Sequence, residues 1–307
     1  MKPFTRSLGS ASLALSALLF LNSCGDGDSE SGSHSHDHDD HGHAAATDGE
    51  EILFNGHDLE GWRGNPANWK VENGTIVGTT TDEAPLPYNQ FLIYEGDPVE
   101  DFELTVDLKL TSDGNNSGIQ YRAQEREDLG ELVVSGYQCD MHPAIWANGM
   151  LYDEKGRGIL CKRGQKVVVT PEGKAKIVGS LGEDPEFNTG EWSTYKIIAK
   201  GNHIQHFVNG TQTVDLYDHH ESDRDLAGVI AIQIHKGPAM KVEIRNVKLT
   251  RFETADLTAP EDTPVPADAA DVNPPKAPKA KGKAKAKGDA KAKGGPAEPA
   301  PAAKAKE

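Results

Sequence analysis

The chain has 307 residues, of which 36% are hydrophobic and 26% are charged, and its formal net charge at pH 7 is −16. A strongly acidic surface repels nucleic-acid phosphates, so the composition argues against a nucleic-acid enzyme and against a specific nucleic-acid partner. The middle of the chain is long enough for one domain that buries about 70% of its unfolded surface.

Residues 1–24 have the pattern of an export signal. A basic start with Lys2 and Arg6 precedes an apolar run at residues 11–21, which is too short to span a membrane. The run leads to Cys24, as in bacterial lipoprotein signals, where this cysteine becomes the lipidated first residue. We therefore expect an exported lipoprotein, anchored to a membrane through a lipid on Cys24 and located in the periplasm or at the cell surface. An ordinary cleaved signal peptide with a chance cysteine is the alternative.

Residues 25–49 consist mainly of Gly, Ser, Asp and His, which is the composition of a disordered linker. Its imidazole and carboxylate groups suit zinc, copper or nickel, but a disordered segment loses entropy when it wraps around a metal ion. A weak metal site and a solvated spacer are therefore the two interpretations of this segment. The histidines concerned are His34, His36, His38, His41 and His43.

Between residues 51 and 253, short runs alternate apolar and polar residues and end at turn-forming residues, which is typical of β-strands. Asn-Gly pairs at residues 73–74 and 209–210 supply the positive φ of tight hairpin turns. Many short strands at this spacing predict an all-β fold with two packed antiparallel sheets. A short helix is also allowed near residues 53–59, and residues 142–190 are the least regular part. The predicted strands are residues 69–72, 75–78, 90–94, 102–110, 118–122, 133–140, 194–200, 204–208, 211–214, 228–235 and 240–249.

Several of these strands carry polar residues on the face opposite to their apolar one. Such side chains could gather over a groove on one face of a sandwich and bind a ligand. The alternative is that Arg122 and Glu243 form a cross-strand ion pair on a wet face, and that His235 is an ordinary surface histidine. The polar set is Gln120, Arg122, Gln138, Asp140, Gln233, His235, Glu243 and Arg245.

Two cysteines, Cys139 and Cys161, lie within the middle domain. In an oxidising compartment a pair within one domain is usually bridged, so we expect a disulfide if their strands are neighbours. Such a bridge would stabilise the domain by about 2 to 4 kcal/mol.

Residues 255–307 are rich in Pro, Ala, Lys and Gly and have no apolar face, which predicts a disordered tail and limits the domain to residues 50–254. The lysines of this tail could contact an anionic polymer, such as a cell-wall component, by screened Coulomb attraction. A spacer with incidental charge is the alternative.

Four segments of the middle domain carry a set of motifs in a fixed order. They are LFNGHDLEGW at residues 53–62, WKVENGTIVG at 69–78, NSGIQYR at 116–122 and GPAMKVEIRNV at 237–247. The set resembles the 3-keto-disaccharide hydrolase family over essentially the whole middle domain. The resemblance implies a concanavalin A-like, jelly-roll sandwich that acts on carbohydrate and is often carried by lipoproteins. Cys139 and Cys161 are not part of the family pattern.

The resemblance also implies an enzyme that cleaves 3-keto-glycosides. In such a glycoside the C2 proton is α to the ketone, so a base can remove it and the enolate can expel the group on C1. This route needs a base near C2 and positive charge near the C3 oxygen, and it does not need the carboxylate pair of ordinary glycosidases. Elimination followed by hydration and direct hydrolysis both remain open. A non-catalytic carbohydrate-binding or surface-adhesion domain on the same sandwich is the alternative.

On this hypothesis His235 is the catalytic base and Arg122 clamps the enolate or a hydroxyl, while Asp140 completes the catalytic set and fixes sugar hydroxyls. Asp140 and His235 could instead hold a divalent metal ion that polarises the ketone. The substrate would be an oligosaccharide or another glycoside, and the remaining polar and aromatic candidates would bind it. These are Gln120, Gln138, Gln233, Tyr152, Trp146, Arg157 and Glu243.

Overall fold

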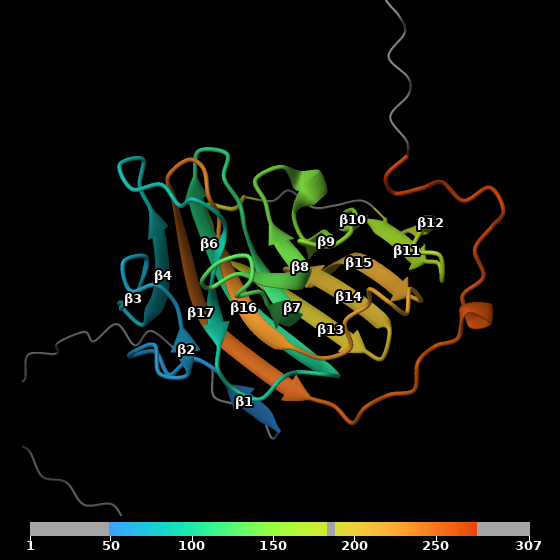
Figure 1. Cartoon of the computed structure of the whole chain (residues 1–307), viewed down its shortest axis with the longest axis horizontal. Coiled ribbons are helices and arrows are strands. Elements are labelled where there is room, and N and C mark those ends of the chain that lie inside the picture. Colours follow the sequence, from blue (N-terminus) through green and yellow to red (C-terminus); the bar gives the residue numbers. More distant parts are fainter. Residues whose placement is uncertain (1–48, 183–187, 275–307) are drawn as a thin grey trace, which may run out of the picture. The chain divides into compact units, whose positions relative to one another are not determined.

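The computed structural model describes residues 49–182 and 188–274 (Figure 1). These residues fold into two β-sheets that pack against each other around an apolar core. Within them, no helix is long and apolar enough to cross a membrane. Cys24 with its predicted export signal, the histidine-rich linker and the tail beyond residue 274 lie outside the described residues.

In the described part of the chain, the first sheet has ten strands. All neighbouring strands run antiparallel, except one parallel pair that involves residues 165–169. Across the sheet the order is β12 (Ala175–Ser180), β11 (Gln165–Val169), β15 (Thr211–Asp218), β14 (His203–Val208), β13 (Ser193–Lys200), β6 (Phe102–Ser112), β17 (Met240–Arg251), β4 (Thr75–Thr80) and β3 (Trp69–Glu72), and β1 (Glu50–Ile52) pairs with β17.

The second sheet has seven strands among the described residues and is antiparallel throughout. Two short 3₁₀ turns, η1 (Ile145–Ala147) and η2 (Pro260–Asp262), complete the regular structure of the described residues. Across the second sheet the order is β10 (Gly158–Cys161), β9 (Leu151–Glu154), β8 (Val134–Met141), β7 (Ser117–Glu125), β16 (Val229–Ile234), β5 (Gln90–Tyr94) and β2 (Trp62–Arg63).

The core lies between the sheets and follows the period-two pattern of the sequence. In β6 the alternating residues from Phe102 to Leu110 are buried, and in β16 so are Ile230, Ile232 and Ile234. Each strand of a sandwich buries one face, so this alternation selects the inward side chains. The predicted two-sheet jelly-roll sandwich is confirmed.

Local predictions are confirmed at the hairpins and fail in two other places. Asn73 and Asn209 both have φ of 50° in the turns that join β3 to β4 and β14 to β15, as the Asn-Gly pairs required. No helix forms at residues 53–59, because Leu53 and Phe54 pack into the core as extended chain and turns follow. The irregular region 142–190 contains β9 to β12, which the sequence pattern missed.

The predicted disulfide is wrong for a geometric reason. Cys139 on β8 and Cys161 on β10 both pair with Leu151 on β9, the strand between them. Two strand spacings separate the cysteines by about 10 Å, whereas bridged cysteines have Cα atoms closer than about 7 Å. Both thiols are free and buried in the core.

The predicted end of the domain at residue 254 is too early. Val272 is 1% exposed, and its N–H donates to the carbonyl of Ala175 on β12 at 3.0 Å. Nearby, Lys176 Nζ lies 2.7 Å from Asp271 Oδ1. Figure 1 shows this segment, in orange, returning along the β11–β12 edge. Residues 255–274 therefore belong to the folded domain.

Arg122 does not lie on the polar face predicted for it. The register of β7 shifts between Gln120 and Gln124, and Arg122 has φ of 48°, so a β-bulge directs its side chain into the interior. The side chain is 1% exposed. Its Nη2 lies 2.9 Å from Asp101 Oδ1, immediately before β6 of the first sheet. The pair therefore joins the two sheets.

Glu243 also lies elsewhere than predicted. It belongs to β17 of the first sheet, where its carboxylate is 3.4 Å from Lys109 Nζ and 3.1 Å from Lys241 Nζ. The alternation of β17 was interpreted correctly, but a strand's alternation does not say to which sheet the strand belongs. Glu243 therefore neither pairs with Arg122 nor shares a sheet with Gln138 and Asp140.

We predict that Arg122→Ala lowers the free energy of unfolding by about 3 to 5 kcal/mol, because it leaves the Asp101 carboxylate buried without its partner. Urea unfolding of the purified domain measures this. The control is Arg126→Ala, which removes a more exposed pair with Asp128 and is expected to cost at most about 1 kcal/mol. Equal small losses in both variants would contradict the structural role of Arg122.

Candidate functional site

A pocket of about 330 Å³ lies on the outer face of the second sheet, the face opposite to the core. We call it the polar pocket. The structure brings together here five of the residues selected from the sequence. They come from β8, β9 and β16 and the position after β16, and they are Gln138, Asp140, Tyr152, Gln233 and His235.

Two glutamines form a chain of hydrogen bonds that ends at Asp140. Gln120 Nε2 donates to Gln138 Oε1 at 2.9 Å, and Gln138 Nε2 donates to Asp140 Oδ1 at 2.6 Å. Gly118 makes room for this chain, since a Cβ there would lie 2.7 Å from the Gln138 side chain. Gln120 therefore supports Gln138 from behind, instead of contacting a ligand as predicted.

Asp140 is a buried carboxyl with an unusual acidity. Burial raises its pKa from 3.8 to about 7, the hydrogen bond from Gln138 opposes the rise, and the negative charge of Glu154 adds to it. The side chain is 5% exposed. Near neutral pH both protonation states of Asp140 are populated, so it can give or take a proton.

The polar pocket also contains two histidines whose hydrogen bonds define their tautomers. His235 Nδ1 contacts the carbonyl of Lys236, which can only accept, so Nδ1 carries the proton and Nε2 holds the lone pair. His142 Nδ1 instead accepts the N–H of Ala144 at 2.9 Å, so its proton is on Nε2. Burial lowers the pKa of both rings, which favours these neutral forms.

Six further residues line the polar pocket and were not selected from the sequence. Glu154 had a usable signal, because it shares the parity of Tyr152 along β9, but that strand was not recognised. Other residues of this group lie in turns, where side chains do not alternate between two faces, so the strand pattern could not identify them. The six are Asn89, Asn116, His142, Met150, Glu154 and Lys155.

Lys155 is a cation that lines the polar pocket, whereas Arg122, selected for positive charge from the sequence, does not line it. Its Nζ lies 2.7 Å from Glu154 Oε1, and its side chain is 36% exposed while that of Glu154 is 7% exposed. Asn89 Nδ2 also donates to the same oxygen, at 3.4 Å. The buried Glu154 carboxylate therefore holds a flexible lysine ammonium at the pocket wall.

Gln233 presents an unsatisfied acceptor in the polar pocket. The side chain is 1% exposed, and within the described residues its Oε1 has no hydrogen-bond partner. A buried amide oxygen without a partner costs free energy, and a ligand hydroxyl would relieve that cost. This favours a ligand that brings a hydrogen-bond donor to this oxygen.

Two predicted substrate-binding residues do not line the polar pocket. Arg157 follows β9, where its Nε lies 2.6 Å from Asp153 Oδ2 and its Nη1 lies 2.8 Å from Asp218 Oδ2. Its charge is therefore used by a separate ion-pair cluster. Trp146 is 51% exposed on η1, and its ring centroid lies 6.2 Å from that of His142. It stands beside the pocket.

The predicted metal site receives no support from the ligand set. Among the described residues, no group of three or more His, Cys, Asp or Glu side chains is arranged to hold a metal ion. Asp140 and His235 both line the polar pocket, but catalytic zinc sites use three protein ligands.

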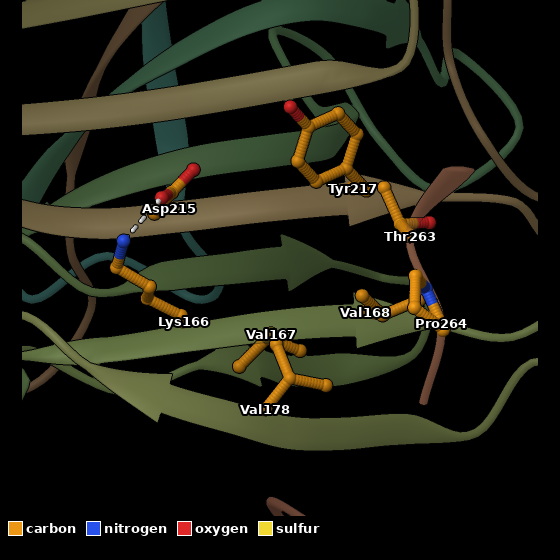
Figure 2. A pocket seen from close by; sticks show the side chains of 8 residues that line it. All are labelled: Lys166, Val167, Val168, Val178, Asp215, Tyr217, Thr263 and Pro264. Atoms are coloured by element: carbon orange, nitrogen blue, oxygen red, sulfur yellow. Dashed lines mark ion pairs between the residues drawn. The ribbon is translucent and has the colours of Figure 1, made fainter. Parts of the chain in front are cut away.

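A second pocket, of about 240 Å³, is built differently (Figure 2). Figure 2 shows Lys166 and Asp215 facing each other across β11 and β15, while Val168 and Pro264 present hydrocarbon near Tyr217. The Asp215 carboxylate is already bound, 3.5 Å from Lys166 Nζ and 2.7 Å from His203 Nε2. This pocket offers no free acid–base pair among the residues that line it.

Comparison with known proteins gives one family match. The family described as 3-keto-alpha-glucoside-1,2-lyase-like domain matches residues 49–250. No curated protein matches the chain.

Solved structures give only distant likenesses. A Parabacteroides distasonis protein, provisionally described as a glycosyl hydrolase, is 21% identical with a TM-score of 0.45 and covers 67% of this chain and 95% of its own. The carbohydrate-binding module CBM66 of Bacillus subtilis is 13% identical with a TM-score of 0.41, covering 64% and 99%. The β-glucanase of Bacillus licheniformis is 13% identical with a TM-score of 0.40, covering 66% and 97%. The family match therefore stands without support from these structures.

We predict that Asp140→Asn makes the domain more stable at pH 8. The folded-state pKa of Asp140 is about 7 against an ordinary value of 3.8, so the folded protein binds this proton more tightly and loses stability as pH rises from about 4 to 7. Asparagine keeps an acceptor for Gln138 without the charge. Thermal unfolding at pH 8 should show a melting temperature at least about 3 °C higher.

The control for this prediction is Asp113→Asn, which alters an exposed aspartate in the turn between β6 and β7. This variant should show no gain at pH 8. A lower melting temperature for Asp140→Asn than for the unmodified domain at pH 8 would mean that the Asp140 carboxylate stabilises the fold, against the effect of its burial.

Proposed function

Because the chain belongs to the 3-keto-alpha-glucoside-1,2-lyase-like domain family, we propose that it cleaves 3-keto-glucosides by elimination across C1 and C2. Family membership supports action on glycosides in general. The single observation that carries the finer proposal is the pairing, in one pocket, of Asp140, whose pKa is about 7, with His235, whose Nε2 holds a lone pair. An elimination needs a proton donor and a proton acceptor together.

In the proposed reaction His235 takes the C2 proton through Nε2. The electrons of the C2–H bond first form the enolate, with a C2=C3 double bond and negative charge on the C3 oxygen. When the ketone re-forms, these electrons make the C1=C2 double bond and the bond from C1 to the leaving oxygen breaks. Asp140 in its protonated form gives its proton to that oxygen. The products are the free aglycone alcohol and a 3-keto sugar with a C1=C2 double bond. Addition of water to this double bond would complete a net hydrolysis.

The electrostatics of the polar pocket suit the intermediate of this reaction. Removal of the C2 proton places negative charge on the C3 oxygen, and the Lys155 ammonium is the cation at the pocket wall. Gln233 Oε1 is an acceptor for a sugar hydroxyl, and the half-buried Tyr152 ring offers a face for the sugar. Arg122, committed to Asp101, takes no part.

We predict a narrow bell-shaped pH profile of kcat/KM for a 3-keto-glucoside. The acid limb lies below the ordinary histidine pKa of 6.5, because burial lowers the pKa of His235 and the base fails only when it is protonated. The alkaline limb lies near pH 7, because Asp140 donates only while it is protonated. Asp140→Asn should remove the alkaline limb, and His235→Ala should lower kcat by about 10² to 10⁴.

The control for these variants is His203→Ala, which changes a half-buried histidine on the first sheet and should leave the rate unchanged. The parent glucoside is the substrate control, since without the ketone its C2 proton is not acidic enough to be removed. Full turnover by His235→Ala would reject the assigned base. Calorimetric binding of both sugars without turnover of either would favour the carbohydrate-binding alternative.

We also propose that the protein is exported and held at a membrane by a lipid on Cys24. The proposal is supported by the basic, apolar and cysteine-ended pattern of residues 1–24. In a bacterial host, Cys24→Ser should move the protein from the membrane fraction to the soluble fraction of the periplasm or medium. Retention of the variant in the membrane fraction would argue against lipid anchoring through this residue.

A further inference from the structure

The polar pocket is bordered by an exposed apolar surface on η1. Ile145 is 43% exposed and Trp146 is 51% exposed, and we call these two residues the apolar ledge. Six large hydrophobic residues are exposed in the described part of the chain, and these are the only two adjacent in sequence. Exposed apolar side chains that gather at a pocket mouth commonly mark a binding surface.

The apolar ledge is held rigidly from below. Asn148 is fully buried, and its Oδ1 accepts from the Tyr195 hydroxyl at 2.7 Å and from the His142 N–H at 3.2 Å. Arg163 Nη1 donates to the Asn148 carbonyl at 2.9 Å, and the Arg163 N–H donates to the Trp146 carbonyl at 3.3 Å. A surface that is already ordered loses little entropy when a ligand binds to it.

The apolar ledge lies on the Asp140 side of the polar pocket. Backbone hydrogen bonds join Asp140 to the two residues that follow the η1 turn and its cap: its N–H donates to the Met150 carbonyl at 3.1 Å, and its carbonyl accepts from Gly149 at 2.7 Å. His142, which lines the pocket, contacts the Trp146 ring. The ledge therefore adjoins the part of the pocket wall formed by His142, close in the fold to the residue that acts as the acid in the proposed reaction.

We propose that the apolar ledge binds the leaving group of the substrate and that this group is a flat aromatic aglycone. The inference rests on the proposed function, because it takes Asp140 as the acid beside the leaving oxygen. The polar pocket has room for roughly one sugar ring, so the leaving group lies outside it. Residues 143–147 read PAIWA and offer no hydrogen-bonding side-chain group except the indole N–H, which suits an aromatic ring better than a second sugar.

The test compares phenyl and methyl 3-keto-glucosides of the same anomeric configuration. Trp146→Ala should raise KM for the phenyl substrate about tenfold and leave its kcat nearly unchanged. Both KM and kcat for the methyl substrate should stay nearly unchanged. Trp146→Phe keeps an aromatic face and should restore most of the affinity. The matched control is Trp192→Ala, which changes a half-buried tryptophan that contacts Arg245 of the first sheet. This variant should change neither KM nor kcat for either substrate.

Equal effects of Trp146→Ala on the phenyl and methyl substrates, or no effect on either, would overturn the proposal. A loss confined to a 3-keto-disaccharide would assign the ledge to a second sugar and would also overturn it. Calorimetric binding of the two glucosides separates this inference from the proposed function, because it needs no turnover. If the unmodified protein turns over neither substrate, the proposed function fails. Tighter binding of the phenyl glucoside than of the methyl glucoside, and loss of that difference in Trp146→Ala, would still show that the ledge binds an aromatic aglycone.

Discussion

The buried ion pair between Arg122 and Asp101 is a charged link between the two sheets, and it fixes the backbone of several segments. Asp101 also accepts the N–H groups of Gly201 at 2.8 Å and Ala255 at 2.7 Å, so one carboxylate ties together β7, the β13–β14 turn and the segment after β17. A charge buried this deeply is tolerated only when its partners are in place. Gln120 precedes this bulge, so the ordinary alternation of β7 keeps it on the outer face, where it supports Gln138.

The polar pocket has the opposite electrostatic design. Among the residues that the structure describes, no cation pairs with the buried Asp140 carboxylate, and the amide hydrogen bond from Gln138 opposes the cost of burying it. This arrangement makes the carboxyl a proton donor near neutral pH, and it makes the charged form unfavourable for the fold. Ionisable groups with strongly shifted pKa values cluster at functional sites, and Asp140 and His235 line the same pocket.

A β-sandwich does not by itself distinguish an enzyme from a sugar-binding module. The chemistry expected from the sequence needs a base and a cation, and the polar pocket is lined by a histidine, His235, and a lysine, Lys155. Lys155, in the turn after β9, is the cation that lines the pocket, where the sequence analysis expected Arg122. Glu154, which pairs with Lys155, was not among the predicted site residues. The requirement for positive charge followed from the reaction, but the residue that meets it depends on how the chain folds.

The sequence by itself determined which face of many strands each residue occupies, because side chains alternate with a period of two. This alternation identified the core of β6 and β16 and placed the polar residues Gln138, Asp140 and Gln233 opposite the core. The Asn-Gly pairs identified the two hairpins. Only the tertiary structure decided that Glu243 belongs to the other sheet, that β9 separates Cys139 from Cys161, and that a bulge reverses Arg122. Alternation is a local property, whereas strand order, bulges and the burial that sets the pKa of Asp140 arise from contacts between residues far apart in the chain.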